Sequence, residues 1–522
     1  MNIRGILWTG WTAQADVLAM REPIWRWLAE AMGMPALLAT LPLRLGDIAL
    51  PPSRLTGAAR AKLVALLGAS GVRQDDAARA AHTAGSGTAD LLRLRAGDLS
   101  NAPDAVLYPR NEADVLASLR VCAELGVAVV PFGGGTGTAA PSRGKHASVV
   151  TLNTSSLRRV TAIDTMSGLA EVEGGITGPG LERQLGERGM TLGHRPDAFE
   201  FSTLGGWIAE PGTGRDAARH GRVGDWLAGV RLATPQGLMT TWRDDLTHIV
   251  AGSQGTLGVI TRATVRVRAL PAHQEHRSYL FPDFASGITA VRQAAREGIA
   301  LNTLRLFDDG ETRFAHQLQR QGTASDLWGD LRARFYDIYR EMRRFDSGAA
   351  AAVVGFSGNE DQIRSSRRRF DALAKRLGAL PLGPDVQRYS TLARRETLLD
   401  RGVGVDSLEV DTSWAKLPSL YVAVRSALNQ AMRSHAPRVG AHGLVLCHIG
   451  HARPDGASMT FTWLYARILE HDVAQAEAIR QAALTAAASH GEQHDALGRA
   501  FARAIKQTLD PTGILNPGKL SF

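Results

Sequence analysis

Pro131-Phe132-Gly133-Gly134-Gly135-Thr136-Gly137-Thr138 is the stretch that decides the fold of this 522-residue chain. The run from Val127 to Val130 before it is rich in β-branched residues and predicts a short strand. Glycine has no Cβ, so the backbone of the following turn can approach a bulky anion and direct its N–H groups at phosphate oxygens. A strand that leads into such a turn indicates an anion site, although a merely tight corner has the same composition.

Three later stretches have the composition needed for the same role. They are rich in Gly, Ser and Thr, and one of them carries Asp197 and another Glu210. A single glycine-rich turn is a weak signal, whereas several in succession point to one extended ligand. The three stretches are Pro196 to Gly206, Glu210 to Gly214, and Gly252 to Thr261.

In order and rough spacing, the four segments resemble the flavin-binding segments of the vanillyl-alcohol oxidase, or PCMH-type, flavoprotein family. The resemblance implies FAD, with its pyrophosphate on the first loop and its isoalloxazine and ribityl chain against the others. The first loop contains no histidine for covalent attachment, so we expect non-covalent FAD. The residues that the resemblance assigns to FAD are Pro131, Phe132, Gly133, Gly134, Gly135, Thr136, Gly137, Thr138, Asp197, Ser202, Thr203, Gly206, Glu210, Gly212, Thr213, Gln254, Gly255, Thr256, Gly258, Val259 and Ile260.

The composition limits what kind of protein this is. A chain of 522 residues is too long for one core and suits two or three domains. The net charge of +9 fits a solvated basic surface, an anionic substrate, the FAD phosphates or an anionic membrane surface. No basic-aromatic nucleic-acid module is present, and no apolar run approaches the roughly 18 residues of a membrane span. With only Cys122 and Cys447, the chain has no disulfide framework, so we expect a cytoplasmic protein.

The pattern along the chain predicts an α+β fold in four parts. We expect residues 1–102 to form an N-terminal helical arm and residues 103–271, with alternating strands and helices, to form the two-subdomain PCMH-type FAD-binding domain that the resemblance implies. Residues 272–465 form a sheet-and-helix cap over the flavin that builds the substrate pocket. Residues 466–522 form a C-terminal helical segment that ends in a Gly- and Pro-rich turn. In the arm, the composition predicts a helix from Trp25 to Leu38.

Further stretches narrow the resemblance to one branch. Together they resemble the alkyldihydroxyacetonephosphate synthase (alkylglycerone-phosphate synthase) family and its bacterial relatives. That family exchanges the acyl group of acyl-dihydroxyacetone phosphate for a long-chain alcohol, without net oxidation. The stretches are Trp8-Thr9-Gly10-Trp11, Ala81-His82, Gly174 to Gly178, Gly193 to Asp197, Leu304 to Asp308, and Cys447 to His451.

The resemblance also implies a small-molecule or lipid-like substrate that carries a phosphate. Arg305 matches a family arginine, and Lys416 stands where the family has an arginine that is thought to hold this phosphate. A phosphate dianion needs fixed cationic donors, which both side chains can supply. A surface ion pair is the alternative for each of them. We also expect a homodimer, and a peripheral contact with a membrane stays open.

The chain departs from the family at its catalytic groups. Thr460 stands where the family has a catalytic tyrosine, and a threonine hydroxyl has too high a pKa to replace a phenol. Of a run of three histidines near the C-terminus, only His494 remains. His448 and His451 are the other candidate acid–base groups. Gln254 replaces the usual glutamate of the last flavin segment.

The spacing of His448 and His451 raises the question of a metal site. Metal-dependent 2-hydroxy-acid dehydrogenases of the superfamily have a second histidine soon after a Gly-Asp-Gly-Asn motif. Here His451 is followed by Ala452 to Met459, which contains no histidine, so we expect no metal. Three functions stay open: a transferase of the synthase type, an FAD-linked oxidase or dehydrogenase of a hydroxylated small molecule, and a flavoprotein that binds its ligand without turnover.

Overall fold

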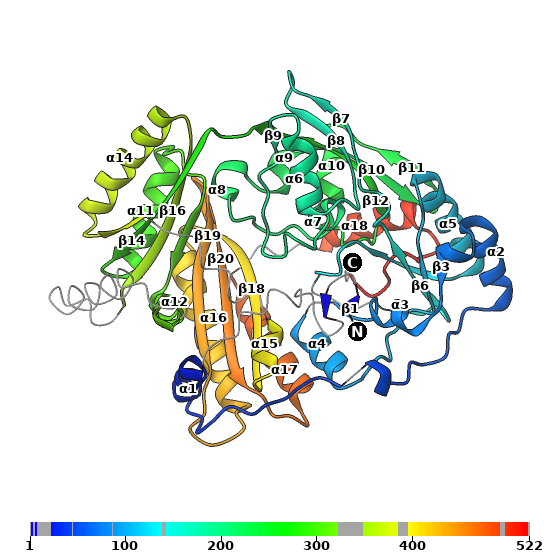
Figure 1. Cartoon of the computed structure of the whole chain (residues 1–522), viewed down its shortest axis with the longest axis horizontal. Helices are drawn as coiled ribbons and strands as arrows, with labels where there is room; N and C mark the ends of the chain where they lie inside the picture. The colour runs from blue at the N-terminus through cyan, green and yellow to red at the C-terminus, as the bar shows by residue number, and fades with distance from the viewer. Residues whose placement is uncertain are drawn as a thin grey trace.

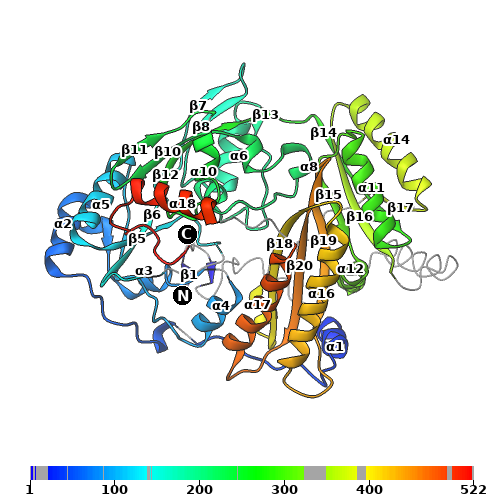
Figure 2. The same cartoon turned by 180° about the vertical axis from the view of Figure 1, so that it is seen from behind.

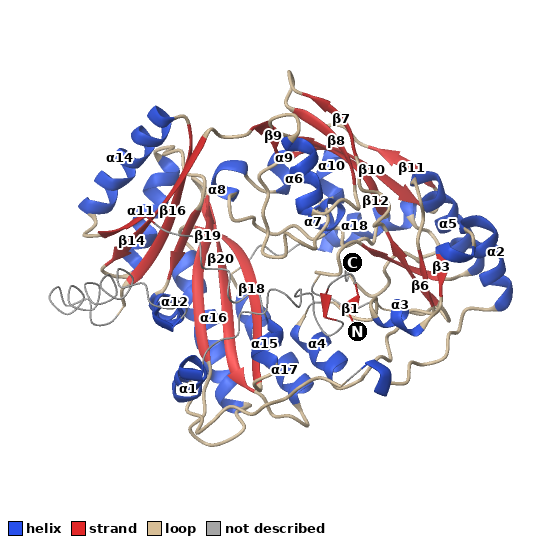
Figure 3. Ribbon diagram, viewed as in Figure 1, coloured by secondary structure: helices blue, strands red, loops and turns tan. Residues whose placement is uncertain are grey.

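A computed structural model of the protein describes residues 2–3, 6–7, 22–43, 45–85, 87–137, 142, 144–243, 245–321, 348–384, 395–490 and 496–519. Figure 1 shows two lobes side by side. One lobe contains a four-stranded and a five-stranded sheet, and the other is built around one seven-stranded sheet (Figure 3). This arrangement confirms the predicted α+β fold with two sheet-based subdomains and a cap. The Trp8 to Trp11 motif lies outside the described residues.

The first sheet of the flavin-binding lobe places the glycine-rich loop. Three of its four strands run parallel, and the predicted strand is the edge strand β5 (Ala128–Phe132), whose last residue opens the loop. Helix α5 (Glu112–Leu125) returns the chain to β5; Asn111 caps its start through a 2.9 Å hydrogen bond from the Asp114 amide, and Gly126 ends it in a left-handed conformation. The strands lie in the order β3 (Val72–Arg73), β4 (Ala105–Leu107), β6 (Val149–Asn153), β5 (Ala128–Phe132).

The second sheet of this lobe is antiparallel. Its strands lie in the order β11 (Gly237–Thr240), β10 (Leu227–Thr234), β12 (Val259–Arg266), β8 (Leu169–Glu173), β7 (Val160–Asp164). Apolar residues of this sheet form one core with helices α6 (Gly178–Gly186), α7 (Leu204–Ala209), α9 (Val223–Trp226) and α10 (Asp245–Val250). A two-stranded sheet of β9 (Met190–Thr191) and β13 (Arg268–Ala269) lies beside helix α8 (Ala217–His220) in the chain's path towards the cap.

The cap is a seven-stranded antiparallel sheet with helices α11, α14, α16 and α17 on one face and α1 (Glu22–Ala31) and α12 on part of the other. Figure 2 shows α16 and α17 lying across the first of these faces, and the opposite face turns towards the flavin-binding lobe. The strand order is β17 (Leu380–Pro384), β14 (His273–Phe281), β16 (Ala350–Gly358), β15 (Leu304–Phe307), β19 (Leu444–Ala452), β20 (Gly456–Ala466), β18 (Val403–Ser413). The main helices are α11 (Phe284–Arg296), α12 (Asp309–Gln321), α14 (Glu360–Arg376), α15 (Arg395–Leu399), α16 (Leu417–Ser434) and α17 (Asp472–Ala488).

The N-terminal arm contacts both lobes. Helix α1 (Glu22–Ala31) buries Trp25 and Leu28 against the cap, whereas α2 (Gly57–Leu67) packs on α5 of the flavin-binding lobe. Between them in space, α3 (Asp76–Ala80) leads to α4 (Thr88–Arg95), which contacts α17 and β18 of the cap. The predicted helix from Trp25 to Leu38 is wrong at its C-terminal end, because Gly33 takes a left-handed conformation (φ +67°) that stops it.

The C-terminal segment returns to the glycine-rich loop. After helix α18 (Ala496–Leu509), Leu515 pairs with Val129 of β5 in a parallel bridge. The Asn516 amide then donates a 2.9 Å hydrogen bond to the Val129 carbonyl. Lys506 holds this turn by donating 2.6 Å and 2.9 Å hydrogen bonds to the carbonyls of Thr256 and Leu515. The tail thus joins the first flavin segment to the last.

Candidate active site

The glycines of the four predicted segments bring those segments into direct contact. A Cβ on Gly133 would lie 2.2 Å from Oγ1 of Thr203, and one on Gly134 would lie 2.0 Å from the carbonyl oxygen of Phe201. The first segment therefore packs on the second at a distance that only glycine allows. In the same way, a Cβ on Gly137 would meet Oε2 of Glu210 at 2.6 Å.

The fourth segment completes the cluster from the other side. A Cβ on Gly255, whose φ is +71°, would lie 3.0 Å from Cγ of Pro131. Gln254 also has a positive φ, of 50°, and its carbonyl accepts a 2.6 Å hydrogen bond from the side chain of Asn516. The sequence interpretation explained the glycines by close approach to an anion. The structure adds a second reason, since these glycines make the segments fit one another.

The cluster also fits the cofactor that the resemblance implies. The loop lies at the carboxyl end of parallel strands, where α/β sheets bind ligands. Within the described part of the chain, no acceptor takes a hydrogen bond from the amides of Gly133, Gly134 or Gly135. Unpaired backbone donors in a turn suit a pyrophosphate. The buried Oγ of Ser253, beside Gln254, likewise lacks a partner among the described atoms.

Several predicted cofactor residues have roles within the protein instead of open side chains. The Ser202 hydroxyl accepts a 2.7 Å hydrogen bond from Trp207, and the Thr203 hydroxyl caps α7 through the Gly206 amide. Val259 and Ile260 are core residues of β12. Their backbone, not their side chains, is what they can present to a cofactor. Five of the remaining assignments lie at or beside the cluster: Phe132, Thr136, Gly137, Glu210 and Gly212. Gly258 packs on Leu232, and the Thr256 hydroxyl donates a hydrogen bond to the Ser253 carbonyl. Thr138 lies outside the described residues.

A cavity of about 130 Å³ opens between the flavin segments and the cap sheet. The flavin-binding lobe contributes Asp197, Thr213 and Gly214. The cap contributes residues from four different strands, all on the face opposite to α16 and α17. They are Arg305 of β15, Ser407 and Glu409 of β18, His448 and Gly450 of β19, and Thr460 of β20, on the sheet face that also packs against α1 and α12. Five predicted site residues are thus brought together: Asp197, Thr213, Arg305, His448 and Thr460.

Asp197, assigned to FAD from the sequence, lies in this cavity. Its carboxylate is 3.3 Å from Nη2 of Arg305 and 3.8 Å from Nε of Arg215. The carboxylate faces the cavity, and 64% of the side chain is accessible. Desolvation raises the pKa of Asp197, but Arg305, Arg215 and His448 outweigh it, so the pKa is lowered overall. Asp197 and Arg305 therefore form an ion pair that links the two lobes.

His448 is held by a residue that the sequence analysis missed. Its Nδ1 lies 3.0 Å from Oε2 and 3.2 Å from Oε1 of Glu311, in the first turn of α12. Arg215, Ser407 and Glu409 were also missed. A usable signal existed only for Arg215, which follows the third flavin segment directly. Glu311 lies 137 residues from His448, and no local pattern connects the two.

Of the predicted catalytic and substrate-binding residues, two lie outside the cavity and one lies outside the described residues. His451 is 4% exposed, and neither ring nitrogen has a partner among the described atoms. Burial, followed by Arg222 and Arg453, lowers the pKa of His451 to about 4, so the ring is neutral at neutral pH. Lys416 is an exposed residue at the start of α16 and does not line the cavity, so its predicted role in holding the substrate is not supported. His494 is among the residues that the structure does not describe.

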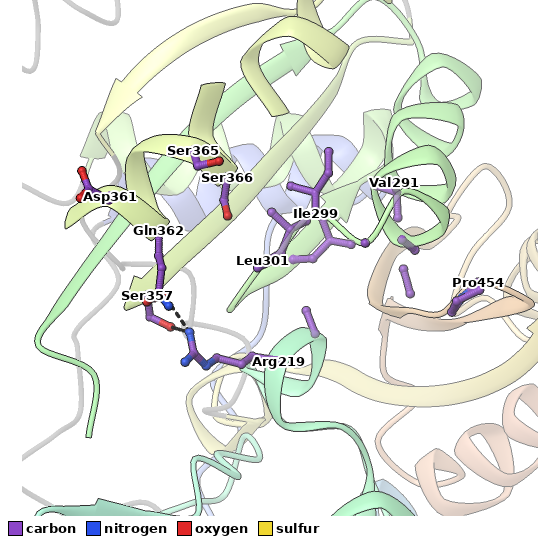
Figure 4. A pocket seen from close by; sticks show the side chains of 16 residues that line it. Arg219, Val291, Ile299, Leu301, Ser357, Asp361, Gln362, Ser365, Ser366 and Pro454 are labelled. Carbon is purple, nitrogen blue, oxygen red and sulfur yellow. Dashed lines mark hydrogen bonds between the residues drawn. The ribbon is translucent and has the colours of Figure 1, made fainter. Parts of the chain in front are cut away.

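A second, larger cavity of about 770 Å³ lies away from the flavin segments. Figure 4 shows Ile299, Leu301 and Val291 on one side and Arg219, bonded to Ser357, on another. None of the predicted site residues lines it. Among the described residues, no group of three or more His, Cys, Asp or Glu side chains is arranged to hold a metal ion. No described helix is long and apolar enough to cross a membrane.

Comparison with known families matches both lobes. The family described as FAD binding domain matches residues 103–243. The family described as FAD linked oxidases, C-terminal domain, matches residues 270–494 and 484–520.

Similar proteins include two alkyldihydroxyacetonephosphate synthases. The one from Dictyostelium discoideum is 29% identical over 484 residues, which cover 86% of this chain and 78% of that protein. The one from Trypanosoma brucei brucei is 28% identical with the same coverage. The mitochondrial D-lactate dehydrogenase [cytochrome] of Kluyveromyces lactis is 23% identical over 81% of this chain and 74% of its own.

Solved structures agree with these relatives. A structure of alkyldihydroxyacetonephosphate synthase has a TM-score of 0.87 at 26% identity and covers 99% of both chains. p-Cresol methylhydroxylase with bound substrate shares the fold, with a TM-score of 0.68 at 16% identity over 90% of this chain and 98% of its own. These relatives, the converging glycine segments and the cavity beside them agree. The chain is an FAD-dependent enzyme and an alkyldihydroxyacetonephosphate synthase-like member of the PCMH-type FAD-binding flavoprotein family.

Proposed function

We propose that this enzyme exchanges an acyl group for an alcohol on a dihydroxyacetone-phosphate-like substrate, without net oxidation. The observation that carries the proposal is the cavity between the flavin segments and the cap, which is lined by a guanidinium, two carboxylates, an imidazole and three hydroxyls. Its volume of about 130 Å³ suits a small polar head group. Similarity to the synthases across nearly the whole chain supports the same assignment.

Arg305 is the residue that we assign to the substrate's phosphate. It is a cavity-lining guanidinium whose Nε is buried and has no partner among the described atoms. Arg215, near the same carboxylate of Asp197, is a second cation within reach of an anion there. A guanidinium can bind phosphate in a two-pronged arrangement, which an exposed lysine such as Lys416 cannot do from outside the cavity. Bound FAD would supply the flavin ring chemistry beside this head group.

The runner-up is an FAD-linked oxidase or dehydrogenase of a hydroxylated small molecule. Two observations favour it: a similar D-lactate dehydrogenase, and a cavity histidine paired with a carboxylate, which suits removal of a hydroxyl proton. Binding of a ligand without turnover, the third interpretation from the sequence, is set aside, because the similar proteins with assigned activities are enzymes.

Anaerobic spectroscopy separates the two activities. The purified protein is mixed without oxygen with an acyl-dihydroxyacetone phosphate and a long-chain alcohol, and separately with 2-hydroxy acids. The proposal predicts formation of the ether product and free acid while the flavin absorbance stays oxidised at the end of the reaction. If a hydroxy acid bleaches the flavin lastingly and no ether product forms, the protein is an oxidoreductase and not a transferase.

We further propose a cytoplasmic homodimer with non-covalent FAD. The absence of a disulfide framework supports the compartment, and the histidine-free loop supports the mode of cofactor binding. Acid precipitation should release the FAD into the supernatant, and light scattering after gel filtration should give twice the mass of 55.9 kDa. A yellow precipitate or a monomer mass would contradict the respective statement.

A further inference from the structure

Glu311 and His448 form a buried pair at the edge of the cavity. The side chains are 11% and 13% exposed, and Nδ1 of His448 is the atom that contacts the carboxylate. Nε2 of His448 has no partner among the described atoms and, unlike the nitrogens of His451, is not buried. Because His448 lines the cavity, Nε2 is the nitrogen available to a bound substrate. An imidazole oriented by a carboxylate on one nitrogen and free on the other suits proton transfer.

Asp308 fixes both members of the pair. Its Oδ1 accepts a 2.8 Å hydrogen bond from the Glu311 amide and a 3.2 Å bond from the Cys447 amide, next to His448. Its other oxygen is 2.7 Å from Nη1 of Arg425 and accepts a 3.0 Å bond from Tyr421. One fully buried side chain therefore ties the start of α12 to β19. The pair is held from behind by a network that does not enter the cavity.

Thr460 lies beside His448 on the neighbouring strand. The two residues are paired in the register of β19 and β20, and both line the cavity. A bulge between Ile449 and His451 then shifts the register. His451 consequently pairs with Ser458 and is buried outside the cavity. The position that lacks a phenol is thus next to the one histidine among the described residues that lines the cavity.

We propose that His448 accepts the substrate's hydroxyl proton and that Glu311 positions it, which rests on the proposed function. In the exchange, Nε2 of His448 takes the proton of the incoming alcohol, and the alcohol oxygen keeps the electron pair. A bond forms between this oxygen and the substrate carbon, and the bond from that carbon to the acyl oxygen breaks. The acid leaves with that electron pair, the proton passes to solvent, and no oxidant or reductant is consumed.

The charges around the pair support this assignment. Glu311 faces His448 from α12, Asp197 and Arg305 face the same cavity, and Glu409 lines it from β18. The ion pair of Asp197 with Arg305 largely cancels itself near the imidazole, whereas the negative charge of Glu311 is directly on Nδ1. An imidazolium that forms at His448 is therefore stabilised by Glu311 at the moment of proton transfer.

The test uses the full-length FAD-bound enzyme and four variants. His448→Gln removes the proton acceptor, and Glu311→Gln keeps a hydrogen-bond acceptor while it removes the charge. The matched controls, His276→Gln and Glu275→Gln, change the same residue types on β14, where His276 contacts Thr303 and Glu275 pairs with Arg367. FAD content and thermal unfolding report on folding. The ether-forming rate is measured from pH 5 to pH 9.

The proposal predicts that His448→Gln lowers the rate by about 10²-fold or more, on the usual scale of acid–base catalysis, with FAD retained. Glu311→Gln lowers the rate less and moves the acid limb of its pH profile to lower pH, and the controls stay within twofold. A variant of His448 that is as active as the parent overturns the proposal. So does a Glu311→Gln enzyme with an unchanged pH profile.

Failure of the proposed function gives a different result. If the parent enzyme forms no ether but its flavin is bleached by a hydroxy acid, the transferase activity is contradicted. The role of His448 as proton acceptor is then tested by the rate of flavin bleaching. His448→Gln then slows bleaching by the same factor if His448 takes the hydroxyl proton. Bleaching at the parent rate in that variant overturns the assignment of His448.

Discussion

The flavin-segment cluster and the cap wall of the cavity are built on different principles. In the cluster, the backbone makes the contacts, and glycines at 133, 134, 137 and 255 set how closely the segments approach. In the cap wall, side chains from β15, β18, β19 and β20 meet, and α12 supplies Glu311 from behind. A site built from backbone requires particular residues at consecutive positions, so it can be recognised in the sequence. A site built from side chains depends on residues far apart in the sequence that only the folded sheet brings together.

The pair His448 and His451 shows the difference within one strand. Both lie on β19, three residues apart, and their chemistry is the same. The bulge at Ile449 leaves His448 on the cavity wall and His451 in a buried position without a hydrogen-bond partner among the described atoms. Sequence spacing gave equal weight to both.

The largest effect is expected in the backbone-built cluster, from Gly134→Asp. The new Cβ would lie 2.0 Å from the Phe201 carbonyl oxygen, and the carboxylate adds negative charge where pyrophosphate is expected. The variant should lose nearly all its FAD and unfold at a lower temperature, as measured by absorbance and calorimetry. Gly186→Ala in α6 is the control, because a Cβ there meets no atom within 4 Å and the residue lies outside the flavin segments. Full FAD occupancy in Gly134→Asp would place the pyrophosphate elsewhere.

In the cap wall, Arg305→Leu removes the guanidinium that we assign to the substrate's phosphate. A charge-assisted hydrogen bond contributes about 1.5–3 kcal/mol, so kcat/KM should fall by about 10- to 100-fold while FAD stays bound. Lys416→Leu should change kcat/KM by less than about twofold, because an exposed charge outside the cavity contributes little. Equal losses in the two variants would mean that Lys416 reaches the substrate after all.

The smallest effect concerns the buried histidines and appears only as a pH dependence. His194 is 2% exposed between Trp207 and Trp226, and burial, with His220, lowers the pKa of His194 to about 4. In the unfolded chain, His194 becomes protonated below about pH 6.5, whereas in the folded chain it becomes protonated only below about pH 4. The free energy of unfolding therefore decreases as the pH falls from 6.5 to 4. Between pH 6.5 and pH 5 this costs about 2 kcal/mol.

His194→Leu should weaken this dependence by the share that His194 contributes, while His220 and His451 keep theirs, measured as the difference in unfolding free energy between pH 7 and pH 5 in urea titrations. The exposed His273, changed to Leu in the same way, should leave the slope unaltered. If the slopes of the parent and His194→Leu coincide, His194 is charged in the folded protein and its buried nitrogens have a partner.

Most of the fold was accessible from the sequence because it depends on local signals. Asn111 and Gly126 mark the two ends of α5, and the β-branched run before Pro131 marks β5. The helix from Trp25 ended earlier than predicted, because apolar spacing alone did not weigh the left-handed Gly33. Asp197 was assigned to FAD from its segment, but its carboxylate turns to Arg305 across the lobe boundary. That direction depends on a partner 108 residues away.

The sequence by itself determined the flavin segments, the cofactor and the family, because the glycine-rich segments and their order can be recognised directly in the sequence. Tertiary structure alone decided which charged and polar side chains share the cavity. Glu311 contacts His448 across 137 residues of sequence, and Lys416 stands exposed at the start of α16, outside the cavity. The physical reason is reach: a hydrogen bond acts over about 3 Å, so only the packed sheet determines which side chains come within it.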